Sequence, residues 1–491
     1  RAASEVFARA EQLLTDIGEL AGRDSERHPH CVETETGRVR FVSVADAVDL
    51  PDDPDCVIVD EAAALPVRRL EAFLAADAVA FTTTIHGYEG AGRGFSVRFR
   101  DRLAESEHTV TDQRLSTPIR YAPADPVEVW GFRALCLDAS PPAAPLVADA
   151  TPESVTYRRL SSADLLDDEH LLREVFGLLV LAHYRTEPND LARLLDAPNV
   201  TARALCHDGH VASVALLARE GDLPADRRAR MYEGERVRGN MIPDVLTSQL
   251  RDEAAGEPVG HRVLRIATHP SVRSRGLGSH LLDSVREEFD DADWLGVGYG
   301  GTPQLLDFWA DNGFSTVHLS KTRNDRSGEH SAVMLDLRSD AGQSLQDRHT
   351  EWFVARLPGM LSDTLAAVDP DVIRATLDSI DGTVSLALSA WEYRVAAGVA
   401  TGGAILDTAP RPVGRLALRH LVAPDESVTL TPRQERLLVR RTLQMQSWER
   451  VADELDYHSV PTCKRALPDA VRPLVQTYGS ETARRELERF R

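Results

Sequence analysis

A short stretch near the middle of the sequence combines arginines with two closely spaced glycines. It follows an apolar segment ending in Ile266, Ala267 and Thr268, and it precedes the helix-like run HLLDSV. The stretch comprises Arg273, Ser274, Arg275, Gly276, Leu277, Gly278 and Ser279. A diphosphate needs converging N–H donors and positive potential, which a helix N-terminus supplies, and glycines let the backbone approach it closely. The stretch therefore predicts a strand–loop–helix site for a diphosphate.

The residues after this loop continue an α/β pattern. WLGVGYGG (294–301) is typical of a strand, and TPQLLDFWADNGF is typical of a helix, with Pro303 near its start and Gly313 just past its end. Loop, strand and helix together resemble the coenzyme A-binding half of GCN5-related N-acetyltransferases. The dinucleotide fingerprint differs, because it has three glycines and a downstream acid. An unrelated α/β loop is the alternative.

Two carboxylates follow an apolar strand in the N-terminal part of the sequence. Asp60 and Glu61 end the segment CVIVDE, and acids in this position hold Mg²⁺ and polarise the attacking water in P-loop ATPases. The next apolar segment leads into threonines and a loop with four glycines (78–94), and Arg120 lies where a cation could reach a γ-phosphate. This order is that of a helicase-like ATPase. A strand end with solvated acids is the alternative.

One part of an ATPase is missing from the sequence. No G-x-x-x-x-G-K-[ST] phosphate loop occurs, and neither of the two lysines follows a glycine. Few backbone N–H groups then remain to bind phosphates. Because the chain starts at Arg1 rather than at Met, we expect the phosphate loop to lie upstream and ATP binding by this chain to be weak.

These features predict a multidomain α/β chain, since 491 residues are too many for one core. Residues 1–139 alternate helical and strand-like stretches, which predicts a partial, P-loop, helicase-like α/β domain. Residues 140–154 are rich in Pro and Ala and predict a linker. Residues 155–337 predict an α+β acetyltransferase domain of the GCN5-related (GNAT) type. A boundary at 338–347 precedes a mainly α-helical C-terminal domain, residues 348–491.

The composition is that of a globular chain with an uneven charge. No run of 18 apolar residues or secretion signal is visible, and the five cysteines form no CxxC, so we expect a cytoplasmic protein without a disulfide framework or metal site. The net charge is −21, which disfavours binding to nucleic acid. Residues 401–491 nevertheless hold 15 basic and 12 acidic residues, so this tail is the better candidate for binding a polyanion.

Eight segments, in one consistent order, resemble a single family. They are DEAAALP, GYEGAGRG, PIRYAPADPVE, AHYRTEPNDL, GNMIPDVL, RIATHPSVRSRGLGS, FWADNGF and NDRSGEHS. Together they resemble the tRNA(Met) cytidine acetyltransferase family, which joins a helicase-like ATPase to an acetyltransferase domain. The resemblance implies ATP-dependent acetylation of the N4 amine of cytidine in tRNA by acetyl-CoA. The expected target is the wobble cytidine of elongator tRNA(Met).

The resemblance also implies site residues. Residues 266–268 should bind acetyl-CoA through backbone groups, residues 273–279 should hold its diphosphate, and Gln304 should make a further contact. Asp311 stands where some members carry a basic contact residue, which puts that contact in doubt. Arg120 matches the ATP-binding arginine, and Mg²⁺ is expected with ATP.

The expected reaction needs a base, because the N4 lone pair of cytosine is delocalised into the ring. A positioned base contributes ~10²–10⁴-fold. We predict His183 for this role, with Tyr184 beside it to stack on or hydrogen-bond the cytosine. The end of a core helix is the alternative for both residues. His269 or His330 could serve as the base instead.

The other half of the transfer concerns the thioester. A backbone N–H near Ala267 or Thr268 should stabilise the oxyanion. Many acetyltransferases protonate the leaving thiolate with a tyrosine, but Phe308 and Trp309 occupy that helix here, so water is expected to do so. Cys206 has no recognisable His–Asp partners, which favours direct transfer over a covalent intermediate.

Arginines recur at helical spacing in the tail. Arg433, Arg436, Arg440 and Arg441 lie at i, i+3, i+7 and i+8, which predicts one side of a helix. We interpret this row as an RNA-binding surface, with an ordinary solvated helix face as the alternative. Arg411, Arg415 and Arg419 form a similar row.

Two other functions are compatible with parts of the sequence. A protein-lysine acetyltransferase would use the same cofactor loop but leaves the ATPase and the arginine rows without a role. A non-acetylating, RNA-remodelling ATPase would need a defective cofactor loop, yet Gly276 and Gly278 are both present.

Overall fold

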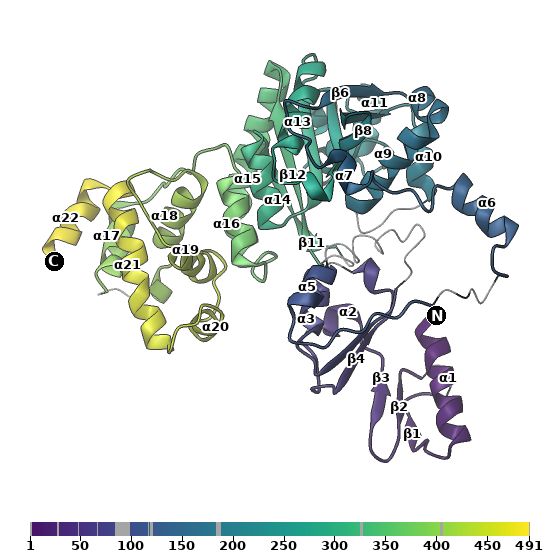
Figure 1. Cartoon of the computed structure of the whole chain (residues 1–491). Coiled ribbons are helices and arrows are strands. Elements are labelled where there is room, and N and C mark those ends of the chain that lie inside the picture. The colour runs from purple at the N-terminus through teal and green to yellow at the C-terminus, as the bar shows by residue number, and fades with distance from the viewer. Residues whose placement is uncertain are drawn as a thin grey trace. The chain divides into compact units, whose positions relative to one another are not determined.

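The computed structural model describes residues 2–26, 29–47, 49–65, 67–83, 99–115, 117, 121–182, 188–324, 328–402 and 406–490. It forms two compact units, one from residues 1–85 and 92–117 and the other from residues 86–91 and 118–491. Figure 1 shows the helices and strands of each unit and labels many of them. Among the described helices, none combines the length and apolarity that crossing a membrane requires.

The first unit has the α/β character expected of it. Its helices are α1 (Ala2–Asp16), α2 (Val44–Ala47), α3 (Val67–Phe73) and α5 (Arg100–Glu105), and its strands are β1 (Gly22–Arg23), β2 (Cys31–Glu33), β3 (Arg38–Arg40), β4 (Cys56–Val59) and β5 (Ala78–Phe81). Strands β1–β3 form an antiparallel sheet, whereas β4 and β5 pair in parallel. Parallel strands need a crossover connection, which α3 supplies. The core of this unit gathers around Val59, Leu70 and Phe73.

The second unit is built on a seven-stranded sheet with the order β11-β12-β10-β9-β8-β7-β6. The strands are β6 (Thr156–Leu160), β7 (Val200–His207), β8 (His210–Glu220), β9 (Gly260–Thr268), β10 (Trp294–Gly300), β11 (Ser315–Arg323) and β12 (His330–Leu337). All neighbours are antiparallel except β9 and β10. The α-helices described before and between these strands are α6 (Pro126–Ala134), α7 (Ala144–Val147), α8 (Ser162–Asp167), α9 (Glu169–Ala182), α10 (Pro188–Asp196), α11 (Ala225–Tyr232), α12 (Met241–Asp244), α13 (Leu277–Glu288) and α14 (Pro303–Asp311).

The sheet is covered on both faces. Along β8, alternate residues enter two different cores: Ala215 and Leu217 join the core that contains α13, whereas Val214 and Leu216 join the core that contains α9. This is the period-two alternation of a strand, with apolar side chains on both sides. Helices α9 and α13 therefore hold the central strands between them.

The C-terminal region is helical, as predicted, and shares a core with the sheet. Its helices are α15 (Asp340–Ser362), α16 (Pro370–Asp378), α17 (Ala390–Ala400), α18 (Arg411–Val422), α19 (Pro432–Leu438), α20 (Trp448–Glu454), α21 (Val460–Tyr478) and α22 (Glu481–Arg489). Phe353 and Leu357 of α15 belong to the same core as Val263 of β9. The boundary predicted at 338–347 is instead mostly the first part of α15, because its polar residues lie on a helix that packs against β11 and β12.

The expected linker is also part of the second unit. Residues 144–147 form α7, and Val147 and Ala150 are completely buried in the main core. Small apolar residues and prolines suit a flexible connection in sequence terms, but the same residues can pack closely against a sheet. The segment therefore packs as part of the folded second unit and is not a flexible connection.

Candidate active site

Strands β9 and β10 separate part-way along their length. Their parallel pairing covers only Gly260–Val263 and Trp294–Val297. Strand β9 nevertheless continues beside β8 as far as Thr268, and β10 continues beside β12 as far as Gly300. A register shift in the β8–β9 ladder lies at this point, where Leu264 is an extra residue in β9. Such a bulge bends a strand and increases its twist, which accounts for the separation.

The predicted cofactor residues Ile266, Ala267 and Thr268 lie on β9 beyond this separation. Ser213 of β8 is completely buried and holds Ala267 and Thr268 in place. Its Oγ donates to the Ala267 carbonyl oxygen at 3.0 Å and lies 3.0 Å from Thr268 Oγ1. The edge of β9 that faces away from β8 thus provides backbone groups on a rigid support, as hydrogen bonding to an extended ligand requires.

The predicted diphosphate loop joins β9 to α13. Gly276 is the N-cap residue of α13, with φ +82°, and no side chain caps this helix. The first intrahelical bond runs from the His280 N–H to the Gly276 carbonyl oxygen, so the N–H groups of Leu277, Gly278 and Ser279 precede the regular helical bonding. An uncapped N-terminus of a 12-residue helix is a suitable place for an anion.

The two glycines of the loop have different physical roles. Gly276 adopts a left-handed conformation that side chains disfavour by about 1–2 kcal/mol. A Cβ on Gly278 would lie 3.4 Å from Phe308 Cζ of α14, so Gly278 allows α13 and α14 to approach closely. Both glycines are needed for geometry, one for the turn and the other for packing.

The two arginines of the loop contact the protein itself. Arg273 Nε donates to the Thr268 carbonyl oxygen at 3.2 Å, and Arg275 Nη1 donates to the Ala148 carbonyl oxygen at 2.6 Å. The side chains of residues 273–275 are exposed, and Ser274 has φ +58°. The arginines therefore hold the loop in place and add positive potential near the N-terminus of α13.

The Pro/Ala-rich segment forms a wall of this site, which the sequence did not indicate. Besides Ala148, it contributes Pro152, whose Cγ would lie 3.7 Å from a Cβ on Gly276. Its Pro142 carbonyl oxygen lies 2.9 Å from His269 Nε2. The apolar residues of this segment could have predicted that it packs against the protein, because a solvated linker does not need them.

Helix α14 lies beside the loop as predicted. Gln304 and Asp311 are exposed on it, and Phe308 is half-buried against Gly278. Trp309 is buried and packs edge-on against Phe314, with ring centroids 4.8 Å apart. The aromatic residues of α14 are thus apolar packing groups without a hydroxyl.

The predicted base His183 and its neighbour Tyr184 lie outside the described residues, directly after the end of α9. The alternative His269 has both ring nitrogens engaged: Nδ1 accepts from the Ser271 N–H at 3.3 Å, so Nε2 donates to Pro142. Burial lowers the pKa of His269. This imidazole caps the turn that follows β9, which argues against its use as the base.

The remaining alternative, His330, is also buried. Its Nδ1 lies 2.7 Å from the Ser320 carbonyl oxygen, and burial lowers its pKa. Cys206 is buried too, and burial raises the pKa of its thiol. A buried thiol with a raised pKa is a poor nucleophile, which agrees with direct transfer.

The predicted acids of the first unit lie at the end of β4. Thr82 Oγ1 donates to Asp60 Oδ1 at 2.7 Å, and the Ala62 N–H donates to the Thr82 carbonyl oxygen at 2.9 Å. Asp60 and Glu61 are both exposed. The acid of one strand is therefore linked to the threonine of the next, which suits a nucleotide-responsive pair. Arg120 and most of the glycine loop lie outside the described residues.

The arginine row of the tail differs from its prediction. Arg433 is exposed and Arg436 half-buried, but Arg440 and Arg441 are buried. The reason is local: residues 439–443 form a π-helical turn after α19, and this turn changes the helical phase by one residue. The four arginines therefore do not share one exposed face.

Each arginine of this row forms a hydrogen bond or an ion pair with another residue of the protein. Arg433 donates to the Asp456 carbonyl oxygen, and Arg436 binds Asp371 with two hydrogen bonds of 2.8 Å. The Arg440 guanidinium donates to the Val368 carbonyl oxygen and lies 2.7 Å from Glu454 Oε2, and Arg441 pairs with Asp407. The second row is similar, since Arg411 pairs with Glu392 and Arg415 and Arg419 donate to carbonyl oxygens.

Family models match both units. One, described as RNA cytidine acetyltransferase NAT10/TcmA, helicase domain, matches residues 1–138, and GNAT acetyltransferase 2 matches residues 174–292 and 281–338. A Haloferax volcanii protein named tRNA(Met) cytidine acetyltransferase TmcA is 61% identical over 492 residues, covering 100% of this chain. Proteins of the same name from Haloarcula marismortui and Nitrosococcus halophilus are 60% and 38% identical, again over 100% of this chain.

This chain belongs to the tRNA(Met) cytidine acetyltransferase family. The resemblance inferred from its eight segments is thereby confirmed, as are the helicase-like and GNAT parts of its fold. The chain spans 65%, 63% and 65% of the lengths of these three family members.

Proposed function

We propose that this protein transfers an acetyl group from acetyl-CoA to the N4 amine of a cytidine in tRNA. The observation that carries the proposal is the separation of β9 from β10 next to the uncapped N-terminus of α13. The separated edge suits the amide-containing arm of acetyl-CoA, and the helix N-terminus suits its diphosphate. The names of the relatives favour tRNA, with the wobble cytidine of elongator tRNA(Met) as the finer proposal.

In the proposed reaction, the thioester supplies an activated acetyl group. The N4–C bond forms as the C–S bond breaks, the N4 proton passes to the base, and the leaving thiolate takes a proton from water. We assign the base to His183, with Tyr184 positioning the cytosine. Backbone N–H groups near Ala267 and Thr268 stabilise the oxyanion.

We further propose that the first unit provides the Mg²⁺-binding part of an ATP site, with weak ATP binding because no phosphate loop occurs in the sequence. Asp60 would hold the ion and Glu61 would polarise water. The link between Asp60 and Thr82 supports this assignment. RNA phosphates would meet the exposed Arg433 and the half-buried Arg436, whereas Arg440 and Arg441 are too buried for that role.

Mass spectrometry of tRNA tests the proposal. The protein is incubated with isotope-labelled acetyl-CoA, ATP and total tRNA, and nucleosides are then analysed for labelled N4-acetylcytidine. The product should appear with the wild type and be lost with Gly276→Val. In a parallel incubation with added protein substrates, labelled lysine there and no labelled cytidine in tRNA would instead identify a protein acetyltransferase.

A further inference from the structure

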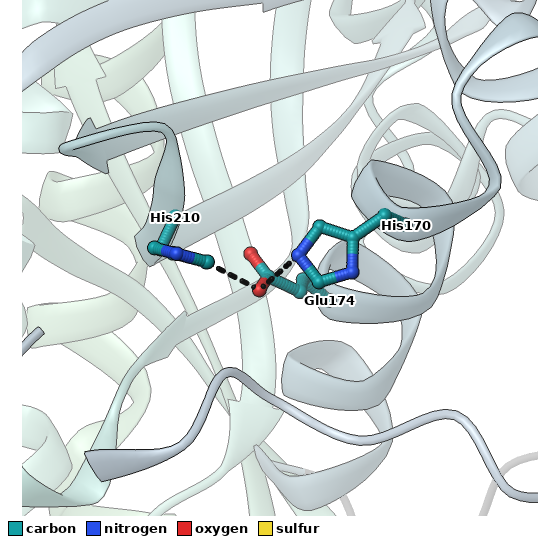
Figure 2. Close-up of side chains that lie close together, drawn as sticks. All are labelled: His170, Glu174 and His210. Atoms are coloured by element: carbon teal, nitrogen blue, oxygen red, sulfur yellow. Dashed lines mark hydrogen bonds and ion pairs between the residues drawn. The ribbon is translucent and has the colours of Figure 1, made fainter. Parts of the chain in front are cut away.

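A buried carboxylate lies between two imidazoles where α9 meets the start of β8, and none of the three residues is assigned to acetyl transfer. Glu174 of α9 is 3% exposed. Its Oε1 lies 2.9 Å from His170 Nε2 and 2.8 Å from His210 Nδ1. Figure 2 shows both rings turned toward this carboxylate from two different elements.

The three side chains are positioned by rigid local structure. His170 and Glu174 are four residues apart on α9, so they lie on the same side of the helix. His210 begins β8 directly after the tight turn at Asp208 and Gly209, whose φ values are +48° and +88°. Two positive φ values are typical of the type I′ turn that fixes hairpin register.

A backbone N–H group also orients the carboxylate of Glu174. Glu174 Oε2 accepts a hydrogen bond from the Val211 N–H at 3.0 Å, which leaves Oε1 directed at the two imidazoles. One ligand atom from each residue lies within 4.8 Å of those of the other two. At metal sites, a hydrogen bond from a neighbouring group commonly orients a ligand in this way.

We propose that His170, Glu174 and His210 bind a divalent transition metal ion of the zinc type, with water as a fourth ligand. Two imidazole nitrogens and one carboxylate oxygen are a common donor set for Zn²⁺, and bonds of about 2.0–2.1 Å place tetrahedral ligand atoms about 3.3 Å apart. The observed separations of 2.8 and 2.9 Å require a modest spreading. The His170 side chain is 67% exposed and can rotate to provide it.

Charge favours the same conclusion. A buried carboxylate loses its hydration, and hydrogen bonds from two imidazole rings replace that hydration only partly. A divalent cation compensates the charge of the carboxylate fully. Sequence spacing did not predict this site, because its ligands come from a helix and from a hairpin 36 residues further along the chain.

The ion would brace the acetyl-transfer site without taking part in the reaction. It would fasten the first half of α9, the helix that leads to His183, to the start of β8. Ser213, three residues after His210, supports the cofactor strand. The proposed metal site is independent of the proposed function, since metal binding is measured without any transfer reaction.

Titration with Co²⁺, a spectroscopic substitute for Zn²⁺, tests the site. Chelator-treated protein should bind one Co²⁺ per chain with the intense visible absorption of tetrahedral coordination, and Zn²⁺ should displace it. His170→Ala and Glu174→Gln should weaken Zn²⁺ binding by more than about 100-fold. His170→Cys, which restores a zinc ligand, should retain it.

The matched control is His458→Ala, which removes another exposed histidine in the tail. It should leave metal affinity unchanged. Absence of tetrahedral Co²⁺ absorption in the wild type would overturn the proposal. So would the same affinity in wild type and His170→Ala, provided circular dichroism shows that both are folded.

Discussion

The cofactor loop and the tail arginine row both contain residues of the right type for binding anions, yet they are built differently. At the loop, backbone N–H groups at the start of α13 have no side-chain cap, and the arginine side chains donate to carbonyl oxygens of the protein and so hold the loop in place. In the tail, guanidinium groups are bound to carbonyl oxygens and carboxylates of the protein. Arginine spacing alone therefore does not identify an anion site, whereas glycine conformation at a helix N-terminus points to one.

The largest expected effect is at Gly276. Gly276→Val should weaken acetyl-CoA binding by at least about 100-fold, because the side chain disfavours φ +82° and displaces the amides that follow. Isothermal titration calorimetry measures the affinity. Gly402→Val is the matched control, since Gly402 has φ +80° in the tail with open space around it. Equal losses in the two variants would remove the special role of the loop.

The second test concerns the buried tail. Arg440→Ala should lower the free energy of unfolding by about 2–4 kcal/mol, because it removes a buried guanidinium that donates to the Val368 carbonyl oxygen and to Gln444 and pairs with Glu454. Denaturant unfolding followed by circular dichroism measures this loss.

Arg450→Ala is the control for Arg440, because Arg450 is half-exposed and contacts the same carboxylate at 2.7 Å. It should cost less than about 1 kcal/mol. If instead Arg440→Ala leaves stability intact and flattens the salt dependence of tRNA binding, the row acts as an RNA surface after all.

The pH dependence of the free energy of unfolding distinguishes buried histidines from exposed ones. Burial, together with the nearby Arg356 guanidinium, lowers the pKa of His318 from 6.5 to about 4. As pH falls below 6.5, the unfolded state takes up a proton before the folded state does, so stability decreases with falling pH. Between pH 7 and pH 5, His318 alone should cost about 1–2 kcal/mol.

His318→Gln should reduce this loss of stability on acidification, since an amide can still accept from Arg356 but does not titrate. Unfolding curves at pH 7 and pH 5 give the comparison. His458→Gln, which changes an exposed histidine, is the control. Identical pH dependence in His318→Gln and wild type would contradict the assignment.

The smallest effect is expected at Ser213. Ser213→Ala removes the hydrogen bond to the Ala267 carbonyl oxygen and the contact with Thr268, at a net cost of about 0.5–1.5 kcal/mol. The KM for acetyl-CoA should rise several-fold while kcat changes little, as steady-state kinetics can show. A fall in kcat with unchanged KM would mean that Ser213 acts on the reaction itself.

Much of this fold was predictable because local patterns specify it. The glycine loop, the strand before it and α13 lie within 30 residues, so sequence spacing translates directly into geometry. The walls of the site were not predictable in this way. Ala148 and Ser213 reach the loop and the cofactor strand through long-range contacts, which leave no periodic signal. The prediction that the tail arginines share one side of a helix was wrong because of the π-helical turn at 439–443, which no residue type in the sequence predicts.

Hydrogen–deuterium exchange with and without acetyl-CoA tests the central claim most directly. Binding should slow exchange in peptides covering residues 264–268 and 276–280, because these backbone groups would bond to the ligand. Peptides covering residues 433–443 should exchange at the same rate in both samples. Unchanged exchange at 264–280 under saturating acetyl-CoA would contradict the account.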